Sequence, residues 1–248
     1  MQAVVPAAGE GTRLRPLTAD RPKGLVEAAG KPLLSYVFET LADLGVSDIA
    51  VVVGYRGDDI REFYGGSFEG IPLSYAEQPE RRGLAHAVAQ AAPLVEESFV
   101  LLNGDNVFDA DLAPVVERHR ESDAAVTSVV EEVPRERARE GGVFAVEDGE
   151  VVGVVEKPDE PPSRTIPRGV YACSPLLFPA CELVTPGHTG EYELSDALDL
   201  LVQAGHTIET VPFEGWCCNV NTPAARERAA PRGGWPLRPS RTAPRAGR

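Results

Sequence analysis

The fold is indicated at the N-terminus by the stretch QAVVPAAGEGTRLRPLT, residues 2–18, with RPK following at residues 21–23. Residues 2–7 are mostly apolar, which is typical of a buried strand. The loop that follows is rich in alanine and glycine, so no large side chain keeps an anion away from its backbone N–H groups. A strand that ends in such a loop predicts an α/β fold with a phosphate-binding site close to its start.

The glycine spacing of this loop excludes two common nucleotide-binding motifs. The dinucleotide fingerprint GxGxxG needs a third glycine at position 14, and that position holds Leu14. The Walker pattern GxxxxGK[ST] does not occur in the sequence either. The loop therefore argues against a dehydrogenase and against a P-loop NTPase.

Short apolar runs alternate with amphipathic segments along most of the chain, which predicts a Rossmann-like α/β domain. Asp148-Gly149 separates the apolar runs 143–146 and 151–155, and this predicts a β-hairpin. We therefore expect a mixed, mostly parallel central sheet flanked by helices. Further strands are expected at residues 2–7, 49–53, 71–76, 99–102, 124–131, 169–172 and 208–213, and helices at 31–45, 58–64, 84–95, 112–121 and 194–204.

The composition is strongly acidic. The chain has 248 residues and a formal net charge of −14, so a nucleic acid would meet a repulsive field and is not an expected partner. Its lysines are Lys23, Lys31 and Lys157, and its other basic residues are arginines. An acid excess with scarce lysine resembles proteins of halophilic microbes, and arginine-rich codon usage in a GC-rich genome is the alternative explanation.

One domain is expected at residues 1–230. Residues 231–248 contain five arginines, four prolines and three glycines but no acidic residue, which predicts a disordered basic tail. No apolar run approaches the ~20 residues that span a bilayer, and the N-terminus lacks the pattern of a signal peptide. We therefore expect a cytoplasmic protein with no membrane partner.

A longer pattern joins the first loop to the lysine that follows it. The pattern GxGTRLxPxT at residues 9–18, with PK at 22–23, resembles the signature of sugar-nucleotide pyrophosphorylases, which transfer a nucleotidyl group from an NTP to a sugar-1-phosphate. The resemblance implies a GT-A-like nucleotidyltransferase fold, with Arg13 and Lys23 clamping the triphosphate. Fixed cations suit this reaction because negative charge develops on the α-phosphate oxygens and on the leaving pyrophosphate.

Three further motifs follow in the order of that family. EQP at 77–79 with GLAHA at 83–87 resembles its nucleobase segment, NGDN at 103–106 its metal motif, and EKP at 156–158 its sugar-phosphate motif. The resemblance implies catalytic roles for Arg13, Lys23 and Asp105; nucleotide contacts for Ala7, Ala8, Gly9, Gly11, Thr12, Arg13, Lys23, Gln78, Gly83 and Gly104; and sugar-phosphate contacts for Gly142, Glu156, Lys157 and Gly169.

Each motif carries a distinct expected role. Gln78 is expected to face the pyrimidine edge of the nucleotide, and His86 to be a residue of the helix face rather than a catalyst. Asp105 is the expected Mg²⁺ ligand, because hard cations prefer oxygen donors and keep substrate phosphates in their shell. Glu156 is expected to bind sugar hydroxyls and Lys157 the sugar phosphate.

The C-terminal motif of the family is altered in this chain. Where family members carry a pattern similar to Wx[DN]xGTP, residues 216–223 read WCCNVNTP. Aligned on Thr222-Pro223, Asn219 takes the place of the second metal-binding aspartate, and Asn221 replaces a glycine. The predicted metal ligands are therefore Asp105 and Asn219, with a shifted loop that uses Asn221 as the alternative.

The resemblance covers residues 1–223 and is strongest for archaeal glucose-1-phosphate uridylyl- and thymidylyltransferases. It implies that UTP or dTTP and a sugar-1-phosphate, first of all glucose-1-phosphate, are converted to an NDP-sugar and pyrophosphate with Mg²⁺. Two alternatives stay open. The departures at Pro6, Gly141, Asn219 and Asn221 fit a catalytically impaired nucleotide-sugar-binding or regulatory homologue. The N-terminal loop also fits a nucleotidyltransferase for another phospho-substrate. The sequence leaves a homo-oligomer open.

Overall fold

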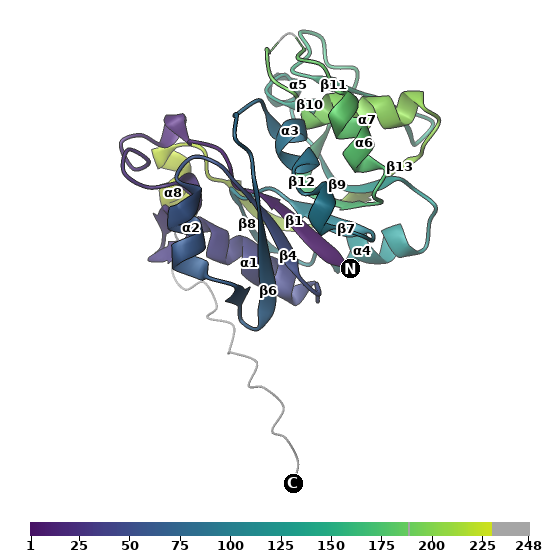
Figure 1. The fold of residues 1–248 in the computed structure, drawn as a ribbon. Coiled ribbons are helices and arrows are strands. Elements are labelled where there is room, and N and C mark those ends of the chain that lie inside the picture. The colour runs from purple at the N-terminus through teal and green to yellow at the C-terminus, as the bar shows by residue number, and fades with distance from the viewer. Residues whose placement is uncertain (188, 230–248) are drawn as a thin grey trace.

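The computed structural model describes residues 1–187 and 189–229, so the tail predicted at residues 231–248 lies outside the described residues. Its centre is an eight-stranded sheet with the order β13-β9-β12-β7-β1-β4-β6-β5 (Figure 1). The strands are β1 Gln2–Pro6, β2 Glu27–Ala28, β3 Lys31–Pro32, β4 Ile49–Val53, β5 Ser67–Phe68, β6 Ile71–Glu77, β7 Phe99–Leu102, β8 Asn106–Ala110, β9 Val126–Glu132, β10 Gly142–Glu147, β11 Glu150–Glu156, β12 Thr165–Cys173, β13 Ile208–Pro212 and β14 Gly215–Asn219. The helices are α1 Leu33–Asp43, α2 Gly57–Tyr64, α3 Leu84–Ala89, α4 Ala113–Arg120, α5 Arg135–Ala138, α6 Leu177–Leu183, α7 Leu194–Gln203 and α8 Pro223–Ala229.

The central sheet is mixed and mostly parallel. β1 runs parallel to both of its neighbours, β4 and β7. β6 runs parallel to β4, and β13 runs parallel to β9. The edge strand β5 is antiparallel to β6. β12 lies between β7 and β9 and is antiparallel to both. The fold class predicted from the sequence is confirmed.

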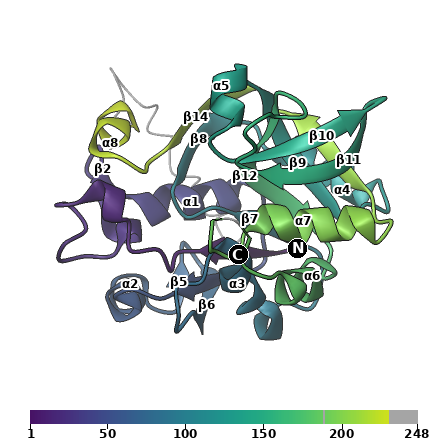
Figure 2. The same ribbon diagram turned by 90° about the horizontal axis from the view of Figure 1, so that it is seen from above.

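Helices cover both faces of the sheet (Figures 1 and 2). Residues of α1, α2 and α4 contribute to the core on one face, and residues of α3, α6 and α7 to the core on the other. Side chains of β1 alternate between these two cores, with Ala3 and Val5 in the first and Val4 in the second. Because both faces of β1 are buried, the strand is continuously apolar in sequence.

Two short antiparallel pairs lie outside the central sheet. β10 and β11 form the predicted hairpin, and its turn residues Asp148 and Gly149 have φ angles of 51° and 87°. Positive φ at both positions is typical of tight hairpin turns, so this prediction is confirmed. β8 pairs with β14, which places Asn219 directly opposite Asn106.

A third apolar cluster joins the two ends of the described chain, and we call it the terminal cluster. It packs the segment after the first loop against β8, β14 and α8. The segment that carries Lys23 is thereby held beside the end of β14. The buried members of the terminal cluster are Leu14, Val26, Ala28, Leu33, Tyr36, Val107, Cys218, Val220, Ala225 and Ala229.

Some elements differ from the sequence prediction. Residues 84–95 were expected to form one helix, but α3 ends at Ala89 and a separate 3-10 turn, Ala92–Leu94, follows. Pro93 explains the interruption, because it has no N–H to continue a helix. β2, β3, β5, α5, α6 and α8 were not predicted, and neither were β8 and β14, which pair with each other across more than 100 residues of sequence. In the described part of the chain, no helix is both long and apolar enough to cross a membrane.

Candidate active site

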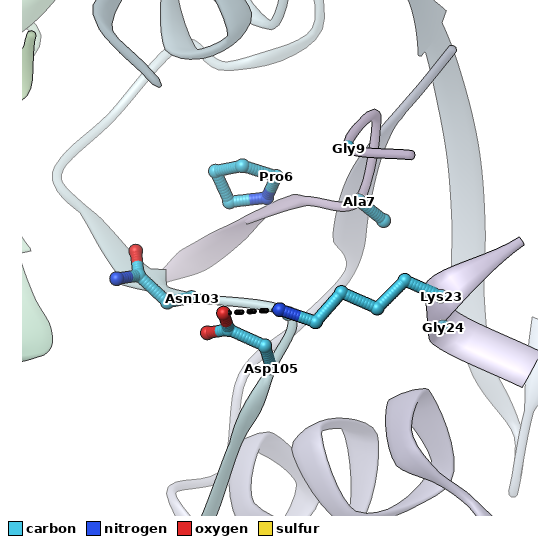
Figure 3. A pocket seen from close by; sticks show the side chains of 8 residues that line it. Pro6, Ala7, Gly9, Lys23, Gly24, Asn103 and Asp105 are labelled. Atoms are coloured by element: carbon cyan, nitrogen blue, oxygen red, sulfur yellow. Dashed lines mark hydrogen bonds and ion pairs between the residues drawn. The ribbon is translucent and has the colours of Figure 1, made fainter. Parts of the chain in front are cut away.

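The loop after β1 forms one wall of a pocket at the carboxyl edge of the parallel strands (Figure 3). The N–H of Ala7 donates to the carbonyl oxygen of Val52 at 2.7 Å, which holds the start of the loop against β4. The opposite wall comes from the residues that follow β7. Open α/β sheets bind ligands at this edge. The pocket is lined by Pro6, Ala7, Gly9, Lys23, Gly24, Asn103, Gly104 and Asp105.

Two glycines of the loop have different structural roles. No atom lies within 4 Å of the position that a Cβ of Gly9 would take, so the missing side chain leaves open space. Gly11 has a φ of 66°, a conformation that glycine adopts without strain, and its carbonyl accepts a 2.9 Å hydrogen bond from Thr18 Oγ1. The loop thus combines a fixed turn at Gly11 with an open backbone at Gly9, as a phosphate site requires.

Lys23 reaches across the pocket to the end of β7. It begins the 3-10 turn Lys23–Leu25, and its Nζ lies 2.6 Å from Asp105 Oδ2 (Figure 3). The same ammonium donates to Asn221 Oδ1. The side chains of Lys23 and Asp105 are 14% and 21% exposed. Both charges therefore face the pocket while largely shielded from bulk water, where their interactions would be weaker.

Asparagine side chains surround Asp105. Asn219 Nδ2 donates to Asp105 Oδ1 at 3.1 Å and to Asn106 Oδ1 at 2.8 Å. Asn221 Nδ2 donates to Asn219 Oδ1, while its own oxygen accepts from the ammonium described above. Oδ1 of Asn103 is buried and has no hydrogen-bond partner among the described residues. The cluster is thus rich in oxygen donors, with Asp105 as its carboxylate.

This donor set fits a hard divalent cation that is shared with substrate phosphates. Asp105 Oδ2 and Asn221 Oδ1 already hold one positive charge between them, the ammonium of Lys23. Within the described residues, no group of three or more His, Cys, Asp and Glu side chains forms a metal cage. Beyond the carboxylate of Asp105, the coordination of a cation here would come from amide oxygens, water and the oxygen atoms of a bound phosphate.

Gly104 lets the ends of β7 and β1 come together. A Cβ at this position would lie 2.6 Å from the carbonyl oxygen of Pro6, which is a backbone atom that cannot swing away. Pro6 itself stays in register with Val52 of β4. The departure from the family pattern at Pro6 therefore leaves β1 intact up to the first pocket residue.

A second pocket adjoins the first at Asn103. Gly142 and Gly169, both predicted to lie beside the sugar, are among its lining residues. A Cβ at Gly142 would collide with Ser195 Oγ, and Gly169 has a φ of 75°, a conformation that glycine adopts without strain. The full lining is Asn103, Asn106, Arg137, Glu140, Gly141, Gly142, Ile166, Pro167, Arg168, Gly169 and Asn219.

Two arginines of the second pocket were not singled out in the sequence. The side chain of Arg168 is only 10% exposed, and its Nη1 lies 3.2 Å from Glu131 Oε2. Arg137 lies 3.9 Å from the same carboxylate. Neither arginine belongs to a motif, and only the fold brings them to this wall.

Glu156 and Lys157, predicted to bind the sugar phosphate, are not among the residues that line either pocket, although Glu156 is paired with Gly142 in the β10–β11 hairpin. Glu156 Oε2 accepts a 2.7 Å hydrogen bond from Ser195 Oγ, and Lys157 Nζ lies 3.0 Å from Glu156 Oε1 and 3.5 Å from Glu193 Oε1. Burial disfavours the charge of Lys157, but the two carboxylates outweigh that effect and raise the pKa of the ammonium above its ordinary value. Lys157 therefore remains a cation at neutral pH.

Gln78 and Gly83 lie together after the end of β6, and neither is among the residues that line the two pockets. Gln78 is 4% exposed, and its Nε2 donates to the carbonyl oxygen of Gly83 at 3.0 Å. The same Nε2 lies 2.9 Å from His86 Nδ1. A Cβ at Gly83 would lie 2.5 Å from the carbonyl oxygen of Tyr192, so close backbone packing requires a glycine here.

Three more of the predicted nucleotide-binding residues, Ala8, Thr12 and Arg13, belong to the segment that follows β1. Arg13 is exposed, and within residues 1–187 and 189–229 its guanidinium makes no hydrogen bond or ion pair. Thr12 is also exposed, whereas Ala8 is buried beneath the loop. The structure thus brings Lys23 and Asp105 together and leaves Arg13 free to meet a ligand.

Glu10 connects the phosphate loop with the loop that follows β6, and no sequence motif indicated this. Its carboxylate forms ion pairs with Arg81 and Arg15. Arg81 contributes most to a lowering of the pKa of Glu10 below its ordinary value, burial opposes it, and Arg15 adds to it. Glu10 is therefore ionised at neutral pH, and its ion pair with Arg81 links the loop after β1 to the loop after β6.

Comparison with known proteins agrees with this geometry. Residues 2–235 match the model of the nucleotidyl transferase family. The UTP–glucose-1-phosphate uridylyltransferase AglF of Haloferax volcanii is 47% identical over 233 residues, which are 94% of this chain and 96% of that protein. The glucose-1-phosphate thymidylyltransferase of Streptomyces griseus is 36% identical over 87% of this chain, which matches 61% of the length of that relative.

The fold also matches solved structures. A crystal structure of a UDP-glucose pyrophosphorylase in complex with UDP-glucose superimposes with a TM-score of 0.84 at 25% sequence identity. The match covers 92% of this chain and 96% of that one.

Proposed function

Because the chain belongs to the nucleotidyl transferase family, we propose that it transfers a uridylyl group from UTP to glucose-1-phosphate, giving UDP-glucose and pyrophosphate. The enzyme class, a sugar-1-phosphate nucleotidyltransferase, is common to the relatives in Haloferax volcanii and Streptomyces griseus. UTP is the first choice of donor, because the relative that shares 47% identity is a uridylyltransferase. dTTP is the second, from the thymidylyltransferase.

The observation that carries the proposal is the pair of pockets that meet at Asn103. The first, with Gly9 and Lys23, suits the triphosphate, and the second, with Gly142, suits the sugar phosphate. A reaction between the two substrates must take place where the pockets meet. Asp105 stands on the first-pocket side of that boundary.

The residues act mainly by holding charge in place. A phosphate oxygen of glucose-1-phosphate attacks the α-phosphorus of UTP, and the bond to the β-phosphate breaks, so negative charge moves onto pyrophosphate. Lys23 is the fixed cation on the triphosphate side, and Lys157, which two carboxylates hold in place, binds the sugar phosphate; Arg13 is exposed and joins the triphosphate only when the ligand is bound. Such preplaced charges stabilise the transition state without reorganisation.

We assign the divalent cation, Mg²⁺, to Asp105 with Asn221 as the second oxygen donor. Asn221 already directs its oxygen at a cation, whereas Asn219 directs its amide nitrogen at Asp105. Asn219, the ligand expected from the alignment, then acts as a ligand only after its amide turns over. When bound there, Mg²⁺ would neutralise the negative charge that develops on the α-phosphate and on the leaving pyrophosphate.

The test is a grid of the four common NTPs and dTTP against several sugar-1-phosphates, with pyrophosphate release as the readout. UTP with glucose-1-phosphate should give the highest kcat/KM. Lys157→Ala should raise the KM for the sugar phosphate while UTP binding, measured without sugar, stays within about twofold. Equal loss of UTP binding would contradict the division into two pockets.

An impaired, ligand-binding homologue is the second candidate, favoured by the presence of amides where a second carboxylate is usual. In that case the protein would bind UTP and UDP-glucose but release no pyrophosphate in any pairing. We further propose a cytoplasmic enzyme of a halophilic archaeon, because the net charge is −14 and the relative from Haloferax volcanii covers nearly the whole chain.

A further inference from the structure

We propose that His86 is a positioning residue that fixes the amide orientation of Gln78 and thereby restricts the donor to pyrimidine bases that carry an N3–H. This rests on the proposed function, together with the expectation from the sequence resemblance that Gln78 faces the base. It goes further by assigning the choice between uracil and cytosine to a residue that makes no expected contact with substrate.

The amide of Gln78 is held by its nitrogen alone. The side chain is nearly enclosed at the end of β6, and its Nε2 faces two acceptors, the carbonyl oxygen of Gly83 at 3.0 Å and His86 Nδ1 at 2.9 Å. An NH₂ group has two hydrogens, so both contacts can be made at once. Oε1 makes no hydrogen bond within the described residues and is left as a free acceptor.

A free acceptor discriminates between pyrimidines. Uracil and thymine present an N3–H donor, whereas the N3 of cytosine is an acceptor and would face an oxygen. A site built to accept a hydrogen bond rejects a base that cannot donate one, because a polar group would stay unpaired. If the amide of Gln78 turned over, its NH₂ would instead suit cytosine.

His86 decides how firmly the amide is held. With the Gly83 carbonyl alone, one N–H of Gln78 would lack a partner, and a turned amide would lose only one hydrogen bond. Nδ1 of His86 can accept only when its proton sits on Nε2. Protonation of the ring would place an N–H against the NH₂ of Gln78 and release the constraint.

The surroundings of His86 keep its ring neutral at physiological pH. Burial lowers its pKa below the ordinary value, Arg82 lowers it further, and Glu80 opposes both. The ring of Tyr192, on the segment that precedes α7, lies 6.1 Å away and completes the set of titratable neighbours. Nδ1 is therefore available as an acceptor at pH 7 and becomes unavailable only in acid.

The experiment compares His86→Leu with His86→Asn in the full chain. Leucine removes the acceptor and keeps the bulk, while the Oδ1 of asparagine can take the place of Nδ1. Calorimetric titration with UTP and with CTP, without sugar phosphate, gives both dissociation constants at pH 7.5. We expect His86→Leu to weaken UTP binding about three- to tenfold and to narrow the preference for UTP over CTP. His86→Asn should stay within about twofold of the wild type in both.

The pH dependence gives a second readout that a packing role would not produce. In the wild type, UTP binding should weaken at acid pH, where His86 becomes protonated; because the pKa of His86 is lowered, this happens below the ordinary titration range of histidine. Protonation of the UTP phosphates in acid affects the wild type and His86→Asn equally. Any further loss of UTP affinity that comes from His86 should be absent in His86→Asn.

Three results would overturn the inference: an unchanged UTP-to-CTP ratio in His86→Leu, equal losses in both variants, or a wild type without preference between UTP and CTP. If the wild type releases no pyrophosphate with any pair of substrates, only the proposed function is contradicted. The inference would still stand if UTP binding kept its preference and His86→Leu reduced it.

Discussion

Lys23 forms the ion pair with Asp105 in the first pocket, and Lys31 offers a matched control for its substitution. Both lysines form an ion pair with a carboxylate, but Lys31 pairs with Glu39 and lies over the ring of Tyr36, away from both pockets. Lys23→Ala should lower kcat about 10²- to 10³-fold, because a fixed charge at the transition state is removed.

Lys31→Ala should stay within about twofold of the wild type in the same assay. Thermal unfolding of both variants shows whether the fold is intact. Comparable kcat values for the two folded variants would remove Lys23 from the mechanism.

Asn219 allows a test of the cation site. Asn219→Asp replaces the 3.1 Å hydrogen bond to Asp105 with a contact between two carboxylates. The variant should unfold at a lower temperature in EDTA, because like charges repel at this distance. It should gain more than the wild type from added Mg²⁺, which neutralises the pair.

The measurement is the unfolding midpoint in EDTA and in MgCl₂. Asn221→Leu should show a smaller Mg²⁺-dependent increase than the wild type in the presence of UTP. An increase of the same size in Asn219→Asp and in the wild type would mean that the cation does not bind beside Asp105.

Residues of the candidate site were identified from the sequence where they belong to a local motif, and were missed where only the folded chain brings them to the site. Lys23 and Asp105 were identified by pattern, and the structure brings them to 2.6 Å. The partner of Lys23 at position 221 is 198 residues away, and no local pattern could show that contact. Arg168 is hidden for the same reason, since it gains its place only when β12 pairs with its neighbours.

At the level of elements, the loops after β1 and β7 provide a pair of glycines with opposite expected behaviour. Gly9 borders open space, so Gly9→Ala should leave the unfolding midpoint within about 1 °C of the wild type but weaken UTP binding, because a methyl group enters the phosphate site. Gly104→Ala places a methyl group 2.6 Å from the carbonyl oxygen of Pro6. It should cost about 1–3 kcal/mol of unfolding free energy, as overpacking does.

Chemical denaturation and UTP titration of both variants check this pair. If Gly9→Ala binds UTP as the wild type does, the loop after β1 is not the phosphate site. If Gly104→Ala is as stable as the wild type, the two strand ends are free to separate.

Elements with their own periodicity were predicted, and short elements without one were not, whether their partners are local, as for β2, β3 and β5, or distant, as for β8 and β14. The buried strands, α1, α7 and the hairpin at Asp148-Gly149 each show a local pattern in sequence. β8 and β14 do not, although they carry Asn106 and Asn219 to the cation site. α6 includes Pro179, which concealed its helical pattern.

For the whole molecule, the net charge of −14 sets the response to salt. Repulsion among acidic side chains destabilises the compact state, and salt screens it. The unfolding midpoint should therefore rise steeply with KCl up to about 0.5 M, where the screening length has fallen to a few ångströms.

NaCl should act like KCl in this range if screening is the cause. Thermal unfolding in a series of both salts provides the test. A midpoint that falls with added KCl would contradict the assignment of net repulsion as a main destabilising term.

The terminal cluster has a consequence for how activity arises during synthesis. The phosphate loop and the residues of both pockets on the central sheet are made early, but the oxygen of Asn221 and the strand that carries Asn219 belong to the last part of the described chain. A growing polypeptide can thus complete most of its eight-stranded sheet while its catalytic centre is still open. Under the proposed function, the cation site is complete only when β14 and Asn221 have packed against β8 and Lys23, so a chain cut before residue 215 should release no pyrophosphate.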